Sequence, residues 1–239
     1  MTPTEAPFRH FHDQLNALNR RLLAMSERAE ALVELSVDAL LTRDAGKADA
    51  VIDADRELDT MELELESAAL ELLALQQPMA RDLRFIVSAI KVTSDLERVG
   101  DHAVNIAESA KRLAAQGATL KPDPTLEDMA RRARAMLSDS IDAFLRGDGA
   151  LGRDVCSRDD QIDSMHEAVF RILLTHMMAD PRTIGLSVEY LNVSRNIERV
   201  ADLATNIGED AVFLAEGKQI KHHFEDQQRE RSAVPQPTG

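Results

Sequence analysis

The sequence predicts an all-α fold made of two tandem three-helix bundles, with six long helices related by an internal duplication. Long segments rich in Ala, Leu, Glu and Arg carry apolar residues every three or four positions, which is typical of amphipathic helices. The 10 Gly and 8 Pro residues gather at the joints between these segments. A stretch of the first half recurs in the second half, as in proteins built from repeats. No window alternates apolar and polar positions with β-branched residues, so no sheet is expected.

The predicted helices follow one another between short breaks. The breaks are RDAG, QQPM, QGATLKPDP, GDG and ADPR, each of which contains Gly or Pro. Helices are expected over 8–43, 46–77, 79–116, 125–146, 149–178 and 182–217. These limits place the first three-helix repeat in residues 1–120 and the second in residues 121–220. The C-terminal tail, 221–239, ends in SAVPQPTG and is expected to fray.

The duplication is visible residue by residue. A shift of 101 positions aligns 81–108 with 182–209, and 11 of these 28 positions are identical. A shift of 104 positions aligns 53–61 with 157–165 in the preceding helices. Each half is therefore a unit of about 100 residues, which is enough for three helices that pack as a bundle.

The chain is acidic, with 42 Asp and Glu against 28 Lys and Arg and a formal net charge of -14. Binding to nucleic acid through its phosphates needs the opposite sign, so neither DNA nor RNA is expected as a partner, and the same holds for anionic lipid surfaces. Only 3% of the residues are aromatic, which disfavours stacking platforms for single strands. Metal cations and basic protein surfaces are compatible with this charge.

The cysteine content and the hydropathy of the chain indicate the cellular compartment in which it is expected. The single cysteine, Cys156, excludes an intrachain disulfide and a cysteine-based zinc site, and it fits a reducing compartment. No basic start followed by an apolar run marks a secretory signal, and no stretch reaches the roughly 18 apolar residues of a membrane span. There is also no nucleophile constellation and no Gly-rich phosphate loop. The sequence therefore predicts a non-enzymatic cytoplasmic protein that reaches a membrane only by docking to membrane proteins.

Acidic pairs at spacing i, i+4 are the feature that carries chemistry. Such residues lie on one helix face with Cβ atoms about 5–6 Å apart. Four of the pairs occupy matching positions in the two halves. They are Asp55/Asp59, Glu97/Asp101, Asp159/Asp163 and Glu198/Asp202. In a chain with this many acids about four pairs arise by chance, so the spacing alone identifies no site.

The position of these pairs relative to the turns is more informative. Helices joined by a short turn pack antiparallel, so residues equidistant from the turn lie at the same level. Asp59 and Glu97 are each 19 residues from Pro78, and Asp55 and Asp101 are each 23 residues from it. The four acids of the second half are equally symmetric about the ADPR turn. Each half is thus predicted to stack two acidic pairs across one helical hairpin.

The carboxylates are expected to form exposed patches, because the apolar residues of the same helices lie on the opposite face. Carboxylate and amide oxygens are hard ligands suited to Mg, Mn and Fe ions, and several in one patch can bridge more than one ion. Asn105 and Asn206 are candidate supporting ligands. Arg98 and Arg199 are either clamps that hold the acids or surface ion pairs worth under about 1 kcal/mol. The plainer alternative is a solvated acidic face.

The motifs LERVGDHAVNIAE and NIERVADLATNIGE, with the late FLAEGKQIKHH, resemble the PhoU family over residues 10–223. The resemblance implies two three-helix bundles with pseudo-twofold symmetry, in a protein that commonly forms a homodimer. It also implies a multinuclear metal cluster on the surface of each repeat, with Fe, Mn, Mg or Zn as candidate ions. The implied ligands are Asp55, Asp59, Glu97 and Asp101 in one repeat and Asp159, Asp163, Glu198 and Asp202 in the other. Asn196 replaces Asp95 in the second copy, so the two clusters can differ in charge or nuclearity.

The resemblance further implies a negative regulator of the phosphate starvation response. Such a protein is an adapter that couples a high-affinity phosphate ABC transporter, through its ATPase subunit, to a membrane sensor histidine kinase. It restrains phosphate uptake when phosphate is plentiful.

Three alternatives are weighed against this function. An accessory protein of a low-affinity phosphate carrier and a metal-free helical scaffold both fit an acidic helical chain. A di-metal carboxylate oxidase needs a Glu-x-x-His motif from each of two helices. The sequence has only one Asp163-x-x-His166, and neither His166 nor His102 has a histidine counterpart in the other half, which disfavours the oxidase.

Overall fold

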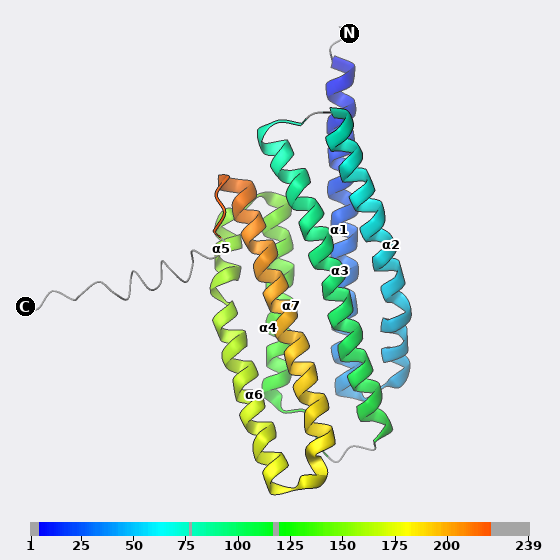
Figure 1. Cartoon of the computed structure of the whole chain (residues 1–239), viewed down its shortest axis with the longest axis vertical. Coiled ribbons are helices and arrows are strands. Elements are labelled where there is room, and N and C mark those ends of the chain that lie inside the picture. The colour runs from blue at the N-terminus through cyan, green and yellow to red at the C-terminus, as the bar shows by residue number, and fades with distance from the viewer. Residues whose placement is uncertain (1–4, 77, 117–119, 221–239) are drawn as a thin grey trace, which may run out of the picture.

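The computed structural model describes residues 5–76, 78–116 and 120–220, and nearly all of them are helical (Figure 1). The elements are α1 (Glu5–Thr42), α2 (Ala45–Gln76), α3 (Ala80–Ala115), α4 (Pro124–Arg146), α5 (Gly149–Ser157), α6 (Asp159–Ala179), a 3₁₀ turn η1 (Pro181–Thr183) and α7 (Ile184–Glu216). This part of the chain contains no strand, so the predicted all-α class is confirmed. None of its helices is both long and apolar enough to cross a membrane. The tail predicted to fray, 221–239, lies outside the described residues.

Capping side chains and left-handed glycines set the limits of the helices in the second repeat. Asp123 precedes α4 and accepts a hydrogen bond from the Thr125 amide at 2.8 Å. Gly147 ends α4 with a φ of 65°, a left-handed conformation that glycine adopts without strain. The next residue, Asp148, accepts hydrogen bonds from two amides in the first turn of α5 at 3.0 Å each. The GDG break of the sequence is therefore one helix end followed directly by one helix start.

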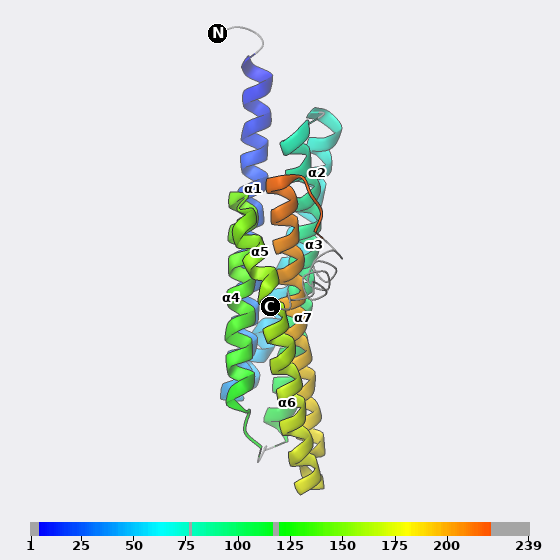
Figure 2. The same cartoon turned by 90° about the vertical axis from the view of Figure 1, so that its left-hand side faces the viewer.

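The two repeats lie side by side along the long axis of the molecule. Helices α1, α2 and α3 form the first bundle, and α4 to α7 form the second. Helix α3 packs against α7, and α1 packs against α4 (Figures 1 and 2). The turn between α2 and α3 is at the top of Figure 1 and the turn between α6 and α7 is at the bottom, so the two hairpins point in opposite directions.

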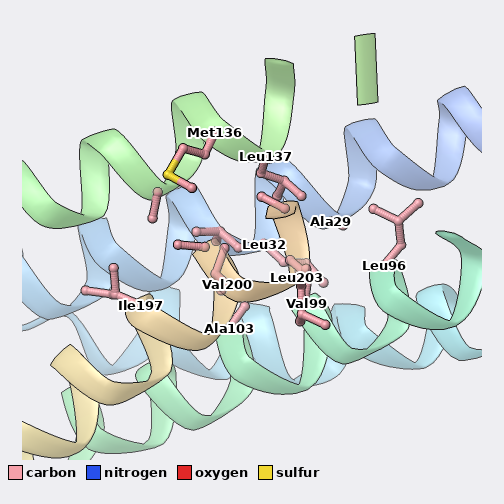
Figure 3. Packing of buried hydrophobic residues seen from close by; sticks show 14 of the residues in the cluster. Ala29, Leu32, Leu96, Val99, Ala103, Met136, Leu137, Ile197, Val200 and Leu203 are labelled. Atoms are coloured by element: carbon pink, nitrogen blue, oxygen red, sulfur yellow. The ribbon is translucent and has the colours of Figure 1, made fainter. Parts of the chain in front are cut away.

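A single buried core is shared by the two repeats (Figure 3). Val99 of α3, Val200 and Leu203 of α7, Leu32 of α1 and Met136 of α4 are all essentially inaccessible to solvent and belong to one cluster. Burial of apolar surface is the main favourable term in folding. We therefore expect the repeats to fold as one unit, although the sequence is duplicated.

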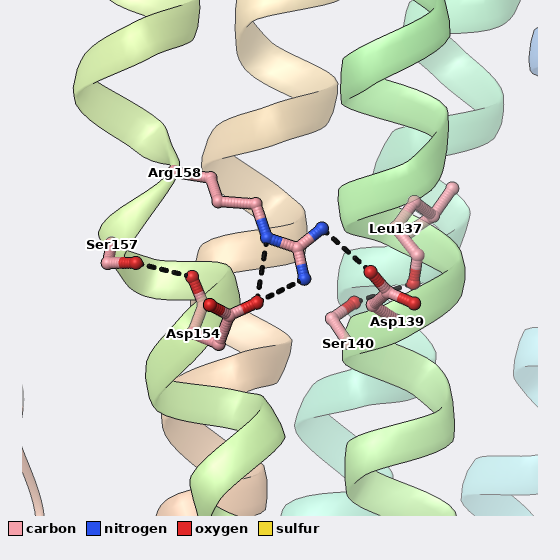
Figure 4. A network of polar contacts seen from close by, with 6 residues as sticks. All are labelled: Leu137, Asp139, Ser140, Asp154, Ser157 and Arg158. Atoms are coloured by element: carbon pink, nitrogen blue, oxygen red, sulfur yellow. Dashed lines mark hydrogen bonds and ion pairs between the residues drawn. The ribbon is translucent and has the colours of Figure 1, made fainter.

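The fifth predicted helix, 149–178, is divided at Arg158 into α5 and α6. At this break the Ser157 hydroxyl donates to the carbonyl of Asp154 at 2.7 Å. Arg158 then forms ion pairs with Asp154 and, across the bundle, with Asp139 of α4 at 2.7 Å (Figure 4). The first repeat has alanine in the position of Arg158, and its α2 runs unbroken. The second repeat thus has a divided helix where the first repeat has a continuous one.

Candidate metal centres on two hairpins

The first acidic patch consists of Asp55 and Asp59 on α2 and Glu97 and Asp101 on α3. Burial, followed by repulsion from Asp59 and Asp101, raises the pKa of Asp55 to about 6. The pKa of Glu97 is raised to about 7, mainly by burial and next by repulsion from Asp101. Like charges disfavour the ionised form in this way when they lie a few ångströms apart in partly buried surroundings. The structure therefore brings the four carboxylates together, at the level that the turn predicts.

Gly100 is what lets α2 approach α3 closely at this patch. A Cβ atom on Gly100 would meet the Asp55 carboxylate at 2.6 Å and would collide with the Leu58 side chain. Leu58 is fully buried and cannot move aside freely. The second repeat has Ala201 in this position, so the duplicated pattern gave no signal for the role of this glycine.

The second acidic patch consists of Asp159 and Asp163 on α6 and Glu198 and Asp202 on α7. Burial and then repulsion from Asp202 and Asp163 raise the pKa of Asp159 to about 6, against the lowering effect of a hydrogen bond from the Thr205 hydroxyl. The pKa of Asp163 is raised by burial and then by repulsion from Glu198 and Asp202. The second hairpin thus repeats the arrangement of the first.

The two patches differ at one position that the shift of 104 relates. In the first patch Glu62 adds a fifth carboxylate, and its pKa is raised by burial and by repulsion from neighbours that include Asp59. In the second patch the same position is His166, whose Nε2 lies 3.9 Å from a carboxylate oxygen of Glu198. Glu62 was not among the predicted ligands, although it lies three residues after Asp59 and therefore on the same face of α2.

The candidate supporting residues behave differently in the two repeats. Arg199 donates to Asp202, one of the predicted ligands, at 2.9 Å, and both side chains are partly exposed. Arg98 instead lies 3.6 Å from Asp95, outside the predicted set. The two asparagines, Asn105 and Asn206, follow four residues after Asp101 and Asp202 on their helices and therefore share their faces. His102 and Asn196, which both differ from their counterparts in the other repeat, contact each other across the interface between the repeats. Nδ1 of His102 lies 2.9 Å from Oδ1 of Asn196.

The ligand chemistry of both patches suits a hard metal ion. Each consists mainly of carboxylates on two rigid helices, and Asp59, Asp101 and Asp163 are exposed to solvent. Among the residues that the structure describes, no three His, Cys, Asp or Glu side chains converge well enough to hold one ion. Metal binding would therefore require the carboxylates to turn toward a common centre. Repulsion between neighbouring carboxylates adds to burial in raising the pKa of Asp55, Glu97, Asp159 and Asp163, and a cation there would relieve this repulsion.

Similarity to known proteins covers both halves of the chain. Residues 22–110 and 126–211 match the PhoU domain, one match in each half. A phosphate-specific transport system accessory protein PhoU homolog of Caulobacter vibrioides is 38% identical over 217 residues, which cover 91% of this chain and 94% of the relative. The protein of the same name from Clostridium acetobutylicum is 35% identical over 214 residues, which cover 88% of this chain and 96% of the relative.

Solved structures agree with the sequence comparisons. The crystal structure of PhoU from Pseudomonas aeruginosa superposes with a TM-score of 0.84 at 33% identity, over 87% of this chain and 100% of that chain. The phosphate transport system regulatory protein PhoU from Streptococcus pneumoniae superposes with a TM-score of 0.82 at 28% identity, over 88% of this chain and 99% of that one. On the evidence of its sequence, its duplicated helices and its whole fold, the chain belongs to the PhoU family.

Proposed function

We propose that this chain is an accessory protein of a phosphate-specific transport system and that it regulates phosphate transport. The observation that carries the proposal is similarity along most of the chain to relatives that bear this name, at 38% and 35% identity. These relatives are covered over 94% and 96% of their length. Nearly the whole length of these relatives therefore has a counterpart in this chain.

In its finer form, the proposal makes the chain a negative regulator of the phosphate starvation response. The chain would work in the cytoplasm as an adapter, docking on the ATPase subunit of a high-affinity phosphate ABC transporter and on a membrane sensor histidine kinase. It would restrain phosphate uptake when phosphate is plentiful. The acidic helical surface supports a docking role, and we expect the protein to be a homodimer.

A non-enzymatic role is supported by the state of its only thiol. Cys156 is buried, and burial followed by repulsion from Glu209 raises its pKa to about 12. A reactive cysteine needs a lowered pKa so that the thiolate forms near neutral pH. Cys156 is therefore a packing residue and not a nucleophile.

We also propose that each acidic patch holds metal ions, with Fe, Mn, Mg or Zn as candidates. Asp55, Asp59, Glu97 and Asp101 would hold them in the first patch, and Asp159, Asp163, Glu198 and Asp202 in the second. Bound cations supply positive charge that offsets the repulsion among these carboxylates. Each hairpin would then present less negative charge to a partner, which changes the electrostatic complementarity on which docking depends.

Deletion of the gene in its host tests the regulatory role. We expect deletion to switch on a phosphate-starvation promoter in phosphate-replete medium, and the intact gene to restore repression. A promoter that stays repressed after deletion would contradict the proposal.

Co-purification separates the main proposal from its alternatives. We expect the tagged full-length chain to retain the transporter ATPase subunit. Retention of a low-affinity phosphate carrier in its place would favour the first alternative. Normal repression by a variant that has lost all eight carboxylates would favour a metal-free scaffold.

A further inference from the structure

Large apolar side chains are exposed almost only on the two hairpins. Of the twelve such side chains found among the described residues, all but Leu23 belong to α2, α3, α6, α7 or the joint before α3. We name two groups of them. The first tip is Leu63, Leu70, Leu83 and Val87, and the second tip is Phe170, Leu174, Ile184 and Val188. Exposed apolar side chains gathered in this way mark interaction surfaces more often than singly scattered ones do.

Three of the four positions in each tip are related by the internal repeat, whereas Leu63 and Phe170 have Glu167 and Glu66 as their counterparts. The shift of 104 relates Leu70 to Leu174, and the shift of 101 relates Val87 to Val188. Leu70 and Val87 are 58% and 37% exposed, and their counterparts are 42% and 43% exposed. Both repeats therefore keep these side chains apolar and in solvent, although most aligned positions of the repeats differ.

Each tip is one surface that spans two helices. Leu83 and Val87 are four residues apart and share a face of α3, and Leu63 and Leu70 are seven apart and share a face of α2. Leu70 and Val87 lie eight and nine residues from Pro78, so the antiparallel hairpin places them at the same level. The same α3 face carries Glu97 of the first acidic patch, ten residues or about 15 Å farther along the helix than Val87. On α2 the tip adjoins the patch, because Leu63 is only four residues from Asp59.

Negative charge surrounds the first tip. The last part of α2, from Glu62 onward, contains Glu62, Glu64, Glu66 and Glu71 and no Lys or Arg. Glu64 and Glu71 are exposed, and Glu66 lies between the first acidic patch and Leu70 in sequence. A partner that covers Leu70 would therefore meet carboxylates on both sides of it.

The cations of the neighbouring part of α3 are turned away from the first tip. The Arg81 guanidinium lies beside Gly147 at the end of α4, and that of Arg84 lies beside the glycine that ends α7. Lys91 is paired with Asp210 of α7 at 3.2 Å. All three therefore face the second repeat, and none of them neutralises the glutamates of α2.

The second tip has a different electrostatic setting. Arg171 directly follows Phe170 and pairs with Glu167, and Arg195 is seven residues after Val188 on the same face of α7. Acidic and basic side chains are mixed there. The two tips thus share three equivalent apolar positions but differ in the charge around them.

We propose that the first tip binds an amphipathic helix of a partner protein, one whose apolar face is flanked by Lys and Arg. An apolar helix face laid across exposed Leu and Val side chains that recur at spacings of four and seven residues is a familiar way to recognise a helix. The glutamates select a basic partner and reject an acidic one. The proposal deepens the adapter role proposed above and rests on it.

Charge also argues against two other occupants. A second copy of this chain that covered the first tip with its own α2 would bring one set of α2 glutamates against the other, so a homodimer is expected to use another surface. An anionic membrane would repel the glutamates in the same way. A basic helical segment is the occupant that satisfies both the apolar and the acidic part of the surface.

A binding titration with a defined peptide tests the proposal. The probe is a fluorescein-labelled helical peptide of about 18 residues, five turns, with Leu on one face and Lys on the other. Its fluorescence anisotropy is measured against the intact protein, the double variant Leu70→Ser/Leu83→Ser and the matched second-tip variant Leu174→Ser/Ile184→Ser. We expect about tenfold weaker binding for the first double variant and less than about twofold change for the second, because truncated apolar anchors dominate helix recognition. All four positions are exposed, and circular dichroism of each variant checks that it is folded.

Further variants and a second peptide distinguish the contribution of charge to binding from that of apolar contact. Glu66→Gln/Glu71→Gln is expected to weaken binding and to reduce its salt dependence, and a peptide with Glu in place of Lys is expected not to bind. Equal binding of the Leu–Lys peptide to the intact protein and to Leu70→Ser/Leu83→Ser would overturn the proposal, because binding would then be electrostatic only. Equal losses in the two double variants would also overturn it.

The alternative occupants have their own readouts. Self-association in sedimentation that Leu70→Ser/Leu83→Ser abolishes would replace the partner helix by a second copy. Binding to vesicles that contain phosphatidylglycerol, lost in the same variant, would replace it by a membrane. If Leu70→Ser/Leu83→Ser loses the peptide but still represses the phosphate-starvation promoter, the tip proposal fails while the regulatory role stands. If deletion of the gene leaves the promoter repressed, the regulatory role itself fails.

Discussion

The ammonium group of Lys91 on α3 lies 3.2 Å from a carboxylate oxygen of Asp210 on α7, and this ion pair joins the two repeats. Ser88 donates to the same oxygen at 3.4 Å, and the Phe213 ring lies 5.7 Å from the Lys91 ammonium. Asp210 is only 3% exposed. Because a buried carboxylate is unfavourable unless it is paired, the charge of Lys91 is what makes Asp210 tolerable in the interface between the repeats.

Replacing Lys91 by alanine should destabilise the protein. The change leaves Asp210 buried without its cation, and we expect the free energy of unfolding to fall by about 1–3 kcal/mol, since the ammonium itself is partly solvated. Urea unfolding measures the effect. Lys111→Ala is the matched control, because Lys111 pairs with Asp49 on the exposed surface, where such a pair is worth under about 1 kcal/mol. Equal losses in the two variants would contradict the role given to Asp210.

Gly100→Ala should destabilise the protein although alanine favours helices. The added methyl group would meet the Asp55 carboxylate and Leu58, and separating α2 from α3 to make room should cost about 1–3 kcal/mol, more than the gain of about 1 kcal/mol in helix propensity. Gly185→Ala is the control. A Cβ there meets only a Gln116 oxygen at 3.8 Å, so we expect a neutral or slightly stabilising change. If Gly100→Ala leaves the free energy of unfolding unchanged or raises it, α2 and α3 are not closely packed at Gly100.

The stability of the metal-free protein should decrease as the pH rises. The pKa of Asp55 and of Asp159 is raised to about 6 and that of Glu97 to about 7, whereas carboxyl groups of an unfolded chain titrate near about 4. The folded state therefore holds protons that the unfolded state has released. The stabilisation is complete below about pH 4 and is lost as the pH rises through about 6 to 7.

Urea midpoints in the presence of a chelator, at about pH 5 and about pH 8, measure this dependence. We expect the lower midpoint at the higher pH. The variant Asp55→Asn/Asp159→Asn should show a smaller difference, because amides do not titrate. A midpoint that increases with pH in the intact protein, or an unchanged difference in the variant, would contradict the raised pKa values of these carboxyl groups.

Much of the fold could be predicted because it follows from local pattern and turn geometry. Apolar spacing and Gly or Pro breaks give the helices, and distance from Pro78 places Asp59 level with Glu97 across the hairpin. The break at Arg158 could not be predicted, because no Gly or Pro marks it in the sequence.

Contacts between the repeats were equally invisible in the sequence. Lys91 and Asp210 are 119 residues apart, and no periodicity links them. The role of Gly100 also depends on how closely α2 approaches, which the spacing of residues along one helix does not define. The ion-pair partner of Arg98 could not be predicted either, because its long flexible side chain can reach acids in more than one direction.

The most direct test of the account is the metal content of the protein, measured by elemental analysis after growth in metal-replete medium and purification without a chelator or an affinity tag. The variant Asp101→Asn/Asp202→Asn, which removes one carboxylate from each patch, is measured beside it. We predict several metal ions per intact chain and a large loss in the variant, with both proteins folded. Absence of metal from the intact protein, or equal metal content in the two, would contradict the account and leave the two patches as solvated acidic surface.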